Sequence, residues 1–167
     1  MTHLNPALHE ARFCPRCAQP ADVEYPRSIS CPHCGYGAYY NPKPVAGAIP
    51  TTPKNEIILL RRAFDPGMGR WTFPGGFVDL GESVPDAAHR EVREELDIEI
   101  ALGPLVGVYS RADDRIVLVV YSATTTQQPR TTDEAIEVET FAPADLPWEE
   151  LAFWSTRDAL EDFLKGH

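Results

Sequence analysis

A glycine-rich loop that leads directly into a capped helix is the feature that most restricts how this chain can fold. It occupies residues 71–98 and reads WTFPGGFVDLGESVPDAAHREVREELDI. Pro74–Gly76 forces a turn whose bare backbone can approach a ligand closely. Ser83 is a favourable N-cap, and Asp86 stands three residues further on, as in a variant of the capping box. The segment therefore predicts a turn followed by a helix that begins near Ser83 and ends near Asp97.

The predicted helix has an apolar face and an acidic face. The apolar residues recur every four positions and should be buried: Ala88, Val92 and Leu96. The acidic residues span an arc of about 100° at 3.6 residues per turn, and they are Glu91, Glu94 and Glu95. Like charges at this spacing repel by roughly a few tenths of a kcal/mol per exposed pair. A bound cation removes that repulsion, and Mg²⁺ takes oxygen ligands of this kind while sharing phosphate oxygens with a substrate.

A solvated helix face is the alternative for these charges. Arg90 and Glu94 stand four residues apart and Arg93 adds a second positive charge, so an inert salt-bridged surface explains the helix taken alone. The preceding loop argues against it, because two glycine turns and Glu82 lead directly into the acidic face. We therefore favour a metal site that serves a phosphorylated ligand.

The segment resembles the Nudix box, G-x5-E-x7-R-E-U-x-E-E-x-G-U, where U is an aliphatic residue. The residues that occupy their box positions are Gly76, Glu82, Arg90, Glu91, Val92, Glu94, Glu95 and Ile98. The one departure is Asp97, where the family has glycine. Aspartate tolerates the left-handed conformation better than most residues, so we expect Asp97 to end the helix without changing the chemistry.

The resemblance implies an α/β/α sandwich that hydrolyses a nucleoside diphosphate derivative with the help of Mg²⁺ or Mn²⁺. It also implies roles for individual residues. Glu91, Glu94 and Glu95 would bind the metal together with the Gly75 carbonyl. Glu82 would support the site, and Arg90 would orient the glutamates by ion pairing. The general base varies in this family, and it is either a box glutamate or one from a later loop, for which the candidates here are Glu134 and Glu137.

Four cysteines form a separate motif near the N-terminus. They are Cys14, Cys17, Cys31 and Cys34, two C-x-x-C pairs with thirteen residues between them. Each pair lets two thiolates of one turn face a common ion, and two pairs complete the tetrahedral coordination that zinc prefers. Disulfides would need an oxidising compartment, and a redox pair would not need a second copy. With four thiolates filling the coordination sphere, we expect the zinc to be structural.

The rest of the chain predicts an α/β fold, and together with the resemblance it implies three parts: a flexible tail at 1–12, a zinc ribbon at 13–41 and a Nudix hydrolase domain at 42–167. The expected strands are Val45–Ile49, Glu56–Leu60, Leu105–Tyr109, Ile116–Ser122 and Ile136–Phe141. A last helix should begin near Ser155 or Thr156 and end at Lys165, where Gly166 stops it.

Charge and hydropathy restrict the partners. The net charge of −10 would repel a phosphate-rich polymer, so we expect no nucleic acid as partner. The longest apolar run, Ile116–Val120, is only long enough for a strand, so we expect no membrane partner either. The N-terminus lacks the basic start and apolar block of an export signal, which favours a cytoplasmic protein.

Two further resemblances bear on the substrate. The NADH pyrophosphatases share the order of ribbon and Nudix domain, but their motif S-Q-P-W-P-F-P is absent from the segment IALGPLVGVYSRADDRIV after the box. The chain is more similar to ribbon-bearing Nudix enzymes that act on FAD or ADP-ribose and release AMP. That likeness rests on the link Tyr39-x-Asn41-Pro42-Lys43-x-Val45 and on Asp145–Pro147 leading to Leu151–Phe153.

Several substrate contacts and alternatives follow. Arginines before the box could meet the phosphates, and aromatic residues could support the adenine ring: Arg61, Arg62, Arg70, Tyr40 and Phe153. NADH is the second choice of substrate. A non-enzymatic nucleotide-sensing regulator is the alternative of another class, but it predicts an eroded box, whereas every box carboxylate is present here. We expect a homodimer built through the ribbon, as in related enzymes.

Overall fold

The computed structural model describes residues 4–166, which form two compact units. The first comprises the chain up to Lys43 together with Arg111–Ile116, and the second comprises Pro44–Ser110 and the remainder from Val117. The sequence contains no sign that the loop Arg111–Ile116 would join the N-terminal unit. Within that unit the Lys43 N–H donates to the Arg115 carbonyl oxygen at 2.9 Å, which ties the two segments together.

The first unit is a small antiparallel sheet next to the cysteine turns. Its strands lie in the order β1 (Asp22–Glu24), β2 (Ser28–Ser30) and β3 (Gly37–Tyr39). In the segment predicted as a tail, Pro6–His9 form a short helix, α1, and Leu8 is buried. The Asn5 amide also donates to the Pro26 carbonyl oxygen at 2.8 Å. Residues 1–3 of the tail expected at 1–12 lie outside the described residues, and its flexibility stays a prediction.

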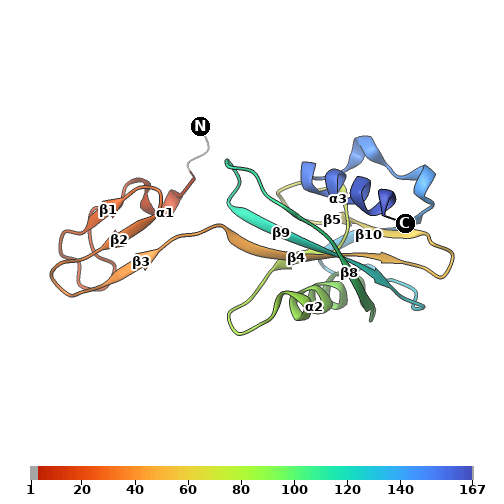
Figure 1. Cartoon of the computed structure of the whole chain (residues 1–167), viewed down its shortest axis with the longest axis horizontal. Helices are drawn as coiled ribbons and strands as arrows, with labels where there is room; N and C mark the ends of the chain where they lie inside the picture. The colour runs from red at the N-terminus through yellow and green to blue at the C-terminus, as the bar shows by residue number, and fades with distance from the viewer. Residues whose placement is uncertain (1–3, 167) are drawn as a thin grey trace. The chain divides into compact units, whose positions relative to one another are not determined.

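The second unit contains a seven-stranded sheet covered by a helix on each face (Figure 1). The main path of the sheet is β10–β5–β4–β9–β8. These strands are β4 (Lys43–Thr51), β5 (Ile57–Arg62), β8 (Ala101–Tyr109), β9 (Ile116–Thr124) and β10 (Ala135–Phe141). The two short strands β6 (Trp71–Thr72) and β7 (Gly75–Phe77) pair with β5 and β4, and 3₁₀ turns occupy Pro143–Asp145 and Trp148–Glu150. All five strands predicted from the sequence are confirmed.

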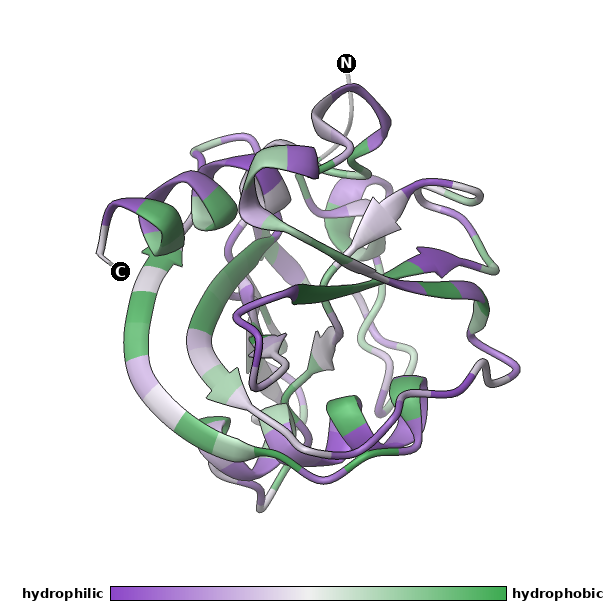
Figure 2. Ribbon diagram, turned by 90° about the vertical axis from the view of Figure 1, so that its right-hand side faces the viewer, coloured by the Kyte–Doolittle hydropathy of each residue, from purple (hydrophilic) through white to green (hydrophobic). Residues whose placement is uncertain are grey.

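Strand β5 shows why both faces of the sheet are covered, because its successive side chains point to opposite faces. Its first four residues are apolar and fully buried, as expected for a strand with packing partners on both sides. Ile57 and Leu59 face the helix α3 (Trp154–Lys165), while Ile58 and Leu60 face the helix α2 (Val84–Leu96). In Figure 2 both the strand ribbons and the helices carry green hydrophobic segments that are interrupted by paler and purple ones.

The two helices keep the predicted ends, with one small correction. The Ser83 side chain accepts a hydrogen bond from the Asp86 N–H at 3.3 Å, and Asp97 ends α2 in the left-handed conformation, with φ 54°. Helix α3 begins at Trp154, before the expected Ser155 or Thr156, and ends before Gly166. Ser155 and Thr156 are buried instead of capping the helix, and the Thr156 hydroxyl contacts that of Thr72 at 3.1 Å. None of the helices within residues 4–166 is long and apolar enough to cross a membrane.

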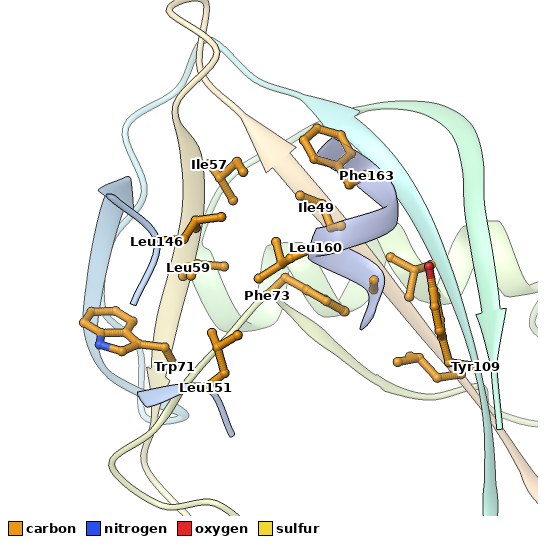
Figure 3. Close-up of a cluster of buried hydrophobic side chains, with 13 residues drawn as sticks. Ile49, Ile57, Leu59, Trp71, Phe73, Tyr109, Leu146, Leu151, Leu160 and Phe163 are labelled. Carbon is orange, nitrogen blue, oxygen red and sulfur yellow. The ribbon is translucent and has the colours of Figure 1, made fainter. Parts of the chain in front are cut away.

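The core between the sheet and α3 provides a test of the packing. Leu160 is fully buried against Ile49 and Leu59 in this cluster (Figure 3). We expect Leu160→Ala to lower the free energy of unfolding by about 2–5 kcal/mol, because it leaves a cavity in a closely packed core. Urea denaturation measures this loss. Leu105→Ala is the control, since Leu105 is 53% exposed and its truncation should change stability by less than about 0.5 kcal/mol. Equal losses for the two variants would contradict this packing.

Candidate functional site

The loop before α2 is built into the sheet. Strands β4 and β5 pair directly only at Thr51 and Ile57. Further along, β7 pairs with β4 and β6 pairs with β5, so the loop strands fill the space between them. The Ala48 N–H also donates to the Pro74 carbonyl oxygen at 3.1 Å. The turn at Pro74–Gly76 is therefore held by backbone hydrogen bonds of the sheet and not only by its own sequence.

Two glycines let this loop touch the neighbouring elements. A Cβ atom on Gly75 would lie 2.7 Å from the Ala46 carbonyl oxygen, so only glycine fits between the paired strands. A Cβ atom on Gly76 would lie 2.3 Å from Oε1 of Glu91. The backbone of the loop and a carboxylate of α2 are thus in direct contact, which a side chain at position 76 would prevent.

Glu95 is the most deeply buried carboxylate of α2, with 4% of its surface exposed. One of its oxygens accepts a hydrogen bond from the Gly75 N–H at 2.8 Å. Burial raises the pKa of Glu95 to about 8, and the negative charges of Glu91 and Glu134 act in the same direction. The charged form of Glu95 is therefore costly without a nearby cation.

Glu91 is the second buried carboxylate, with 8% of its surface exposed. Burial raises its pKa as well, although the adjacent Arg90 acts against this shift. Glu94 differs, because it is an exposed residue and its carboxylate accepts from Arg90 at 2.9 Å. The acidic face seen in the sequence is therefore divided into two buried carboxylates and one at the surface.

Arg90 connects the loop to the helix through a set of short hydrogen bonds. Its Nε and Nη2 atoms bind both oxygens of Glu82, at 2.9 and 3.0 Å. Its Nη1 donates to Glu91 at 2.7 Å, and Nη2 donates to the Phe77 carbonyl oxygen at 2.9 Å. The side-chain hydrogen bond from Arg90 lowers the pKa of Glu82. These contacts are the ones expected of an arginine that orients the glutamates, and the roles assigned to Glu82 and Arg90 stay predictions.

The two later candidates for the general base are placed differently. Glu134 lies in the turn before β10, and its charge contributes to the raised pKa of both Glu91 and Glu95. It is therefore on the same side of the molecule as these carboxylates. Glu137 forms an ion pair with Arg61 at 2.8 Å. Of the two, only Glu134 is brought toward the carboxylates of α2.

The predicted substrate-binding residues are dispersed. Arg61 lies over the Trp71 ring, 4.6 Å from its centroid, and also pairs with Glu150 at 3.2 Å. Arg70 is exposed and donates to the Leu151 carbonyl oxygen at 3.3 Å. Tyr40 is 38% exposed and belongs to the first unit. Arg61 is thus engaged in internal contacts on the face of the sheet that packs against α3.

Arg62 and Phe153 form a pair on the carboxylate side. The Arg62 guanidinium lies 5.3 Å from the centroid of the Phe153 ring, and its positive charge is among those that act on Glu95 by lowering its pKa. Arg62 has the same parity in β5 as Ile58 and Leu60, which face α2. The alternation of strand residues was therefore the signal that separates Arg62 from Arg61.

The four cysteines converge in the first unit. Their Sγ atoms all lie within 4.8 Å of one another, with Cys14 and Cys34 at 3.6 Å and Cys17 and Cys31 at 3.7 Å. A tetrahedron with Zn–S bonds of about 2.3 Å places its sulfurs about 3.8 Å apart. The cysteines are thus positioned to bind a metal ion. Within residues 4–166 no other group of three potential ligands gathers so closely, and this includes the three glutamates of α2.

The family of the chain is established by comparison with known proteins. A family model described as a NUDIX domain matches residues 41–163, so the chain belongs to this family. The resemblance stated from the box is thereby confirmed. A crystal structure of a NUDIX hydrolase from Nitrosomonas europaea superposes with a TM-score of 0.84 at 29% sequence identity, covering 94% of this chain and 92% of that one. The expected Nudix α/β fold is confirmed as well.

Two curated relatives resemble the chain over shorter stretches. An ADP-ribose pyrophosphatase from Methanocaldococcus jannaschii is 35% identical over 104 residues, which cover 59% of this chain and 60% of that protein. A NAD-capped RNA hydrolase, NudC, from Pseudomonas aeruginosa is 36% identical over 93 residues, which cover 54% of this chain and 32% of that protein. The chain therefore spans less than two thirds of the length of either relative.

The burial of Glu95 predicts a pH dependence of stability in the metal-free protein. Its pKa is about 8 in the folded state, against an ordinary value of 4.5. Folding thus favours the protonated form, whose stabilisation is complete below about pH 4.5 and is lost as the pH rises through about 8. Glu95→Gln stays neutral and still accepts from Gly75, so it should reduce this loss. Urea denaturation with EDTA, from about pH 5 to about pH 9, measures both proteins.

Glu161→Gln is the control for this measurement, because Glu161 is an exposed glutamate on α3. It should retain the pH dependence of the wild-type protein. An equally steep loss of stability in Glu95→Gln would show that another group causes it.

Proposed function

We propose that this protein is a metal-dependent hydrolase that cleaves the diphosphate linkage of a nucleoside diphosphate derivative, with ADP-ribose as the first candidate. The observation that carries this proposal is the burial of Glu91 and Glu95 against the backbone of Gly75 and Gly76. Buried carboxylates of like charge favour a divalent cation beside them. The all-oxygen donor set suits a hard ion such as Mg²⁺ or Mn²⁺.

The residues that would hold the ion are Glu91, Glu94 and Glu95, with the Gly75 carbonyl oxygen. When bound, such an ion activates a water molecule and neutralises charge on the leaving phosphate. Arg90 keeps Glu91 and Glu94 in place through hydrogen bonds from Nη1. Its hydrogen bonds to Glu82 and to the Phe77 carbonyl oxygen fix the loop against α2. Glu95 is instead oriented by the Gly75 N–H.

Glu134 is the residue that we assign as general base. It would accept the proton of the attacking water, which then adds to one phosphorus while the bridging oxygen leaves with the other. Glu137 is the weaker candidate, because its carboxylate is paired with Arg61. Arg62 would bind a phosphate and Phe153 would support a ring or ribose of the substrate. This pair replaces Arg61 as the first choice, and Arg70 and Tyr40 are kept as more distant candidates.

ADP-ribose ranks first because the archaeal relative is an ADP-ribose pyrophosphatase. FAD is retained because of the ribbon-bearing sequence pattern, and either substrate would release AMP. NADH, or RNA capped with NAD, is the second candidate, since the Pseudomonas relative is a NAD-capped RNA hydrolase. The missing motif after the box disfavours it. Nucleotide sensing without hydrolysis is the alternative of another class.

A panel of substrates with Mg²⁺ tests this function. The compounds are ADP-ribose, FAD, NADH, a NAD-capped RNA oligonucleotide and a nucleoside triphosphate, and products are resolved by chromatography. We expect AMP from ADP-ribose or FAD, and a fall in kcat of at least about a hundredfold in Glu95→Gln, because a metal ligand in a buried site is lost.

Glu161→Gln serves as the matched control, with unchanged kcat. Binding of ADP-ribose without cleavage of any compound would favour the sensor, and cleavage confined to the NAD compounds would reverse the order of substrates. Full activity of Glu95→Gln would remove that residue from the metal site.

We also propose that the cysteine cluster binds structural zinc within a ribbon at 13–41, followed by a hydrolase domain at 42–167, and that the ribbon supports a homodimer. Metal analysis should find one zinc ion per chain, and Cys31→Ser should lose it because a buried ligand is removed. His33→Ala is the control and should retain zinc, since His33 is exposed beside the cluster. Light scattering on the same samples reports the oligomeric state. Wild-type protein without zinc would contradict the zinc site, and a monomer in solution would contradict the homodimer.

A further inference from the structure

The C-terminal end of α2 is capped by a distant segment, residues 130–134. The last carbonyl groups of a helix have no partner inside the helix, so they must be satisfied by other groups. Here the Arg130 N–H donates to the Leu96 carbonyl oxygen at 2.9 Å, and the Thr132 hydroxyl donates to the Glu95 carbonyl oxygen at 3.2 Å. An ion pair between Arg130 and Asp97, at 3.4 Å, adds a side-chain contact.

Thr132 has a second role in this segment. Its Oγ1 atom also accepts a hydrogen bond from the Glu134 N–H at 3.3 Å. One half-buried hydroxyl therefore bridges the backbone of Glu95, in α2, and the backbone of Glu134, in the turn before β10. On its other side Glu134 is held by β5 and the loop after it, because its carbonyl oxygen accepts from the Ala63 N–H at 3.0 Å.

We propose that Thr132 is a positioning residue that fixes Glu134 relative to the carboxylates of α2. The inference rests on the proposed function, in which Glu134 accepts a proton from the attacking water. A base must lie within hydrogen-bonding distance of that water, and small displacements reduce the rate strongly. Ala63 places Glu134 relative to the sheet, whereas Thr132 places it relative to α2, where the metal ligands are.

A simple helix cap is the competing explanation for Thr132, and the two differ in what they change. Loss of a cap lowers the stability of the folded protein but leaves kcat of the folded fraction intact. Loss of a positioning contact lowers kcat. KM for the substrate changes little, because the binding of the substrate's phosphates and adenine ring does not depend on Glu134.

The experiment compares three variants in steady-state hydrolysis of ADP-ribose, or of whichever substrate the panel identifies, with Mg²⁺. Thr132→Val keeps the shape of the side chain but removes both hydrogen bonds, so kcat should fall about tenfold with KM within about twofold. Thr132→Ser keeps the hydroxyl and should retain most of the activity. Thr131→Val is the matched control, since Thr131 is the exposed neighbour in sequence, and it should behave as the wild type.

A double-mutant cycle separates action through Glu134 from any other effect. In a Glu134→Gln background, Thr132→Val should cause no further loss of kcat, because the residue that it positions no longer accepts a proton. An unchanged kcat in Thr132→Val, or the same fractional loss in both backgrounds, would overturn the proposal while the proposed function stands.

Amide hydrogen exchange, followed by NMR, tests the contact without turnover. The Glu134 amide should exchange faster in Thr132→Val, whereas the Arg130 amide, bound to Leu96, should keep its rate. Equal exchange at Glu134 in wild type and variant would also overturn the inference. If the wild type cleaves nothing in the panel, the proposed function is wrong. The catalytic role proposed for Thr132 is then wrong as well, even where the exchange result confirms the hydrogen bond to Glu134.

Discussion

The structure depends on the close approach between a glycine loop and the carboxylates of one helix. Glu91 and Glu95 are removed from water at a considerable free-energy cost. The space for them exists because Gly75 and Gly76 carry no side chains and because β7 holds the loop against β4. The divergence of β4 from β5, which admits the two short strands, is therefore a requirement of the site.

The two buried carboxylates are compensated unequally. Arg90 donates to Glu91 directly, and it also neutralises Glu82 and Glu94. Glu95 accepts one hydrogen bond from a backbone N–H. The positive charge of Arg62 lowers the pKa of Glu95 less than that hydrogen bond does. Negative charge is thus least satisfied at Glu95, next to the loop backbone. A cation placed there would relieve the largest remaining electrostatic cost, which supports the proposal that Glu95 is a metal ligand.

Local sequence patterns predicted the helices and strands well. They predicted the contacts between residues that are distant in the sequence less well. The cap at Ser83 and the left-handed Asp97 follow from residue chemistry within one helix, and the strands follow from runs of apolar residues. The choice between Glu134 and Glu137 could not be made in this way, because it depends on which arginine lies across the sheet. The burial of Leu8 in the expected tail likewise depends on residues elsewhere in the unit. Arg62 stands between these cases, since it was grouped with Arg61 in the prediction although alternation along β5 could have separated the two.

Asp97 shows how a departure from a family pattern can be absorbed. Glycine is favoured at this position because it adopts a left-handed conformation without strain. Aspartate also tolerates that conformation, and here its carboxylate pairs with Arg130, whose N–H caps the same helix end. Both partners of this ion pair are largely exposed, so it contributes little by itself. The pair matters for its location, because Arg130 belongs to the segment that carries Thr132 and Glu134. The end of the helix is thus where a change in the box can influence Glu134, the proposed base, without touching a proposed metal ligand.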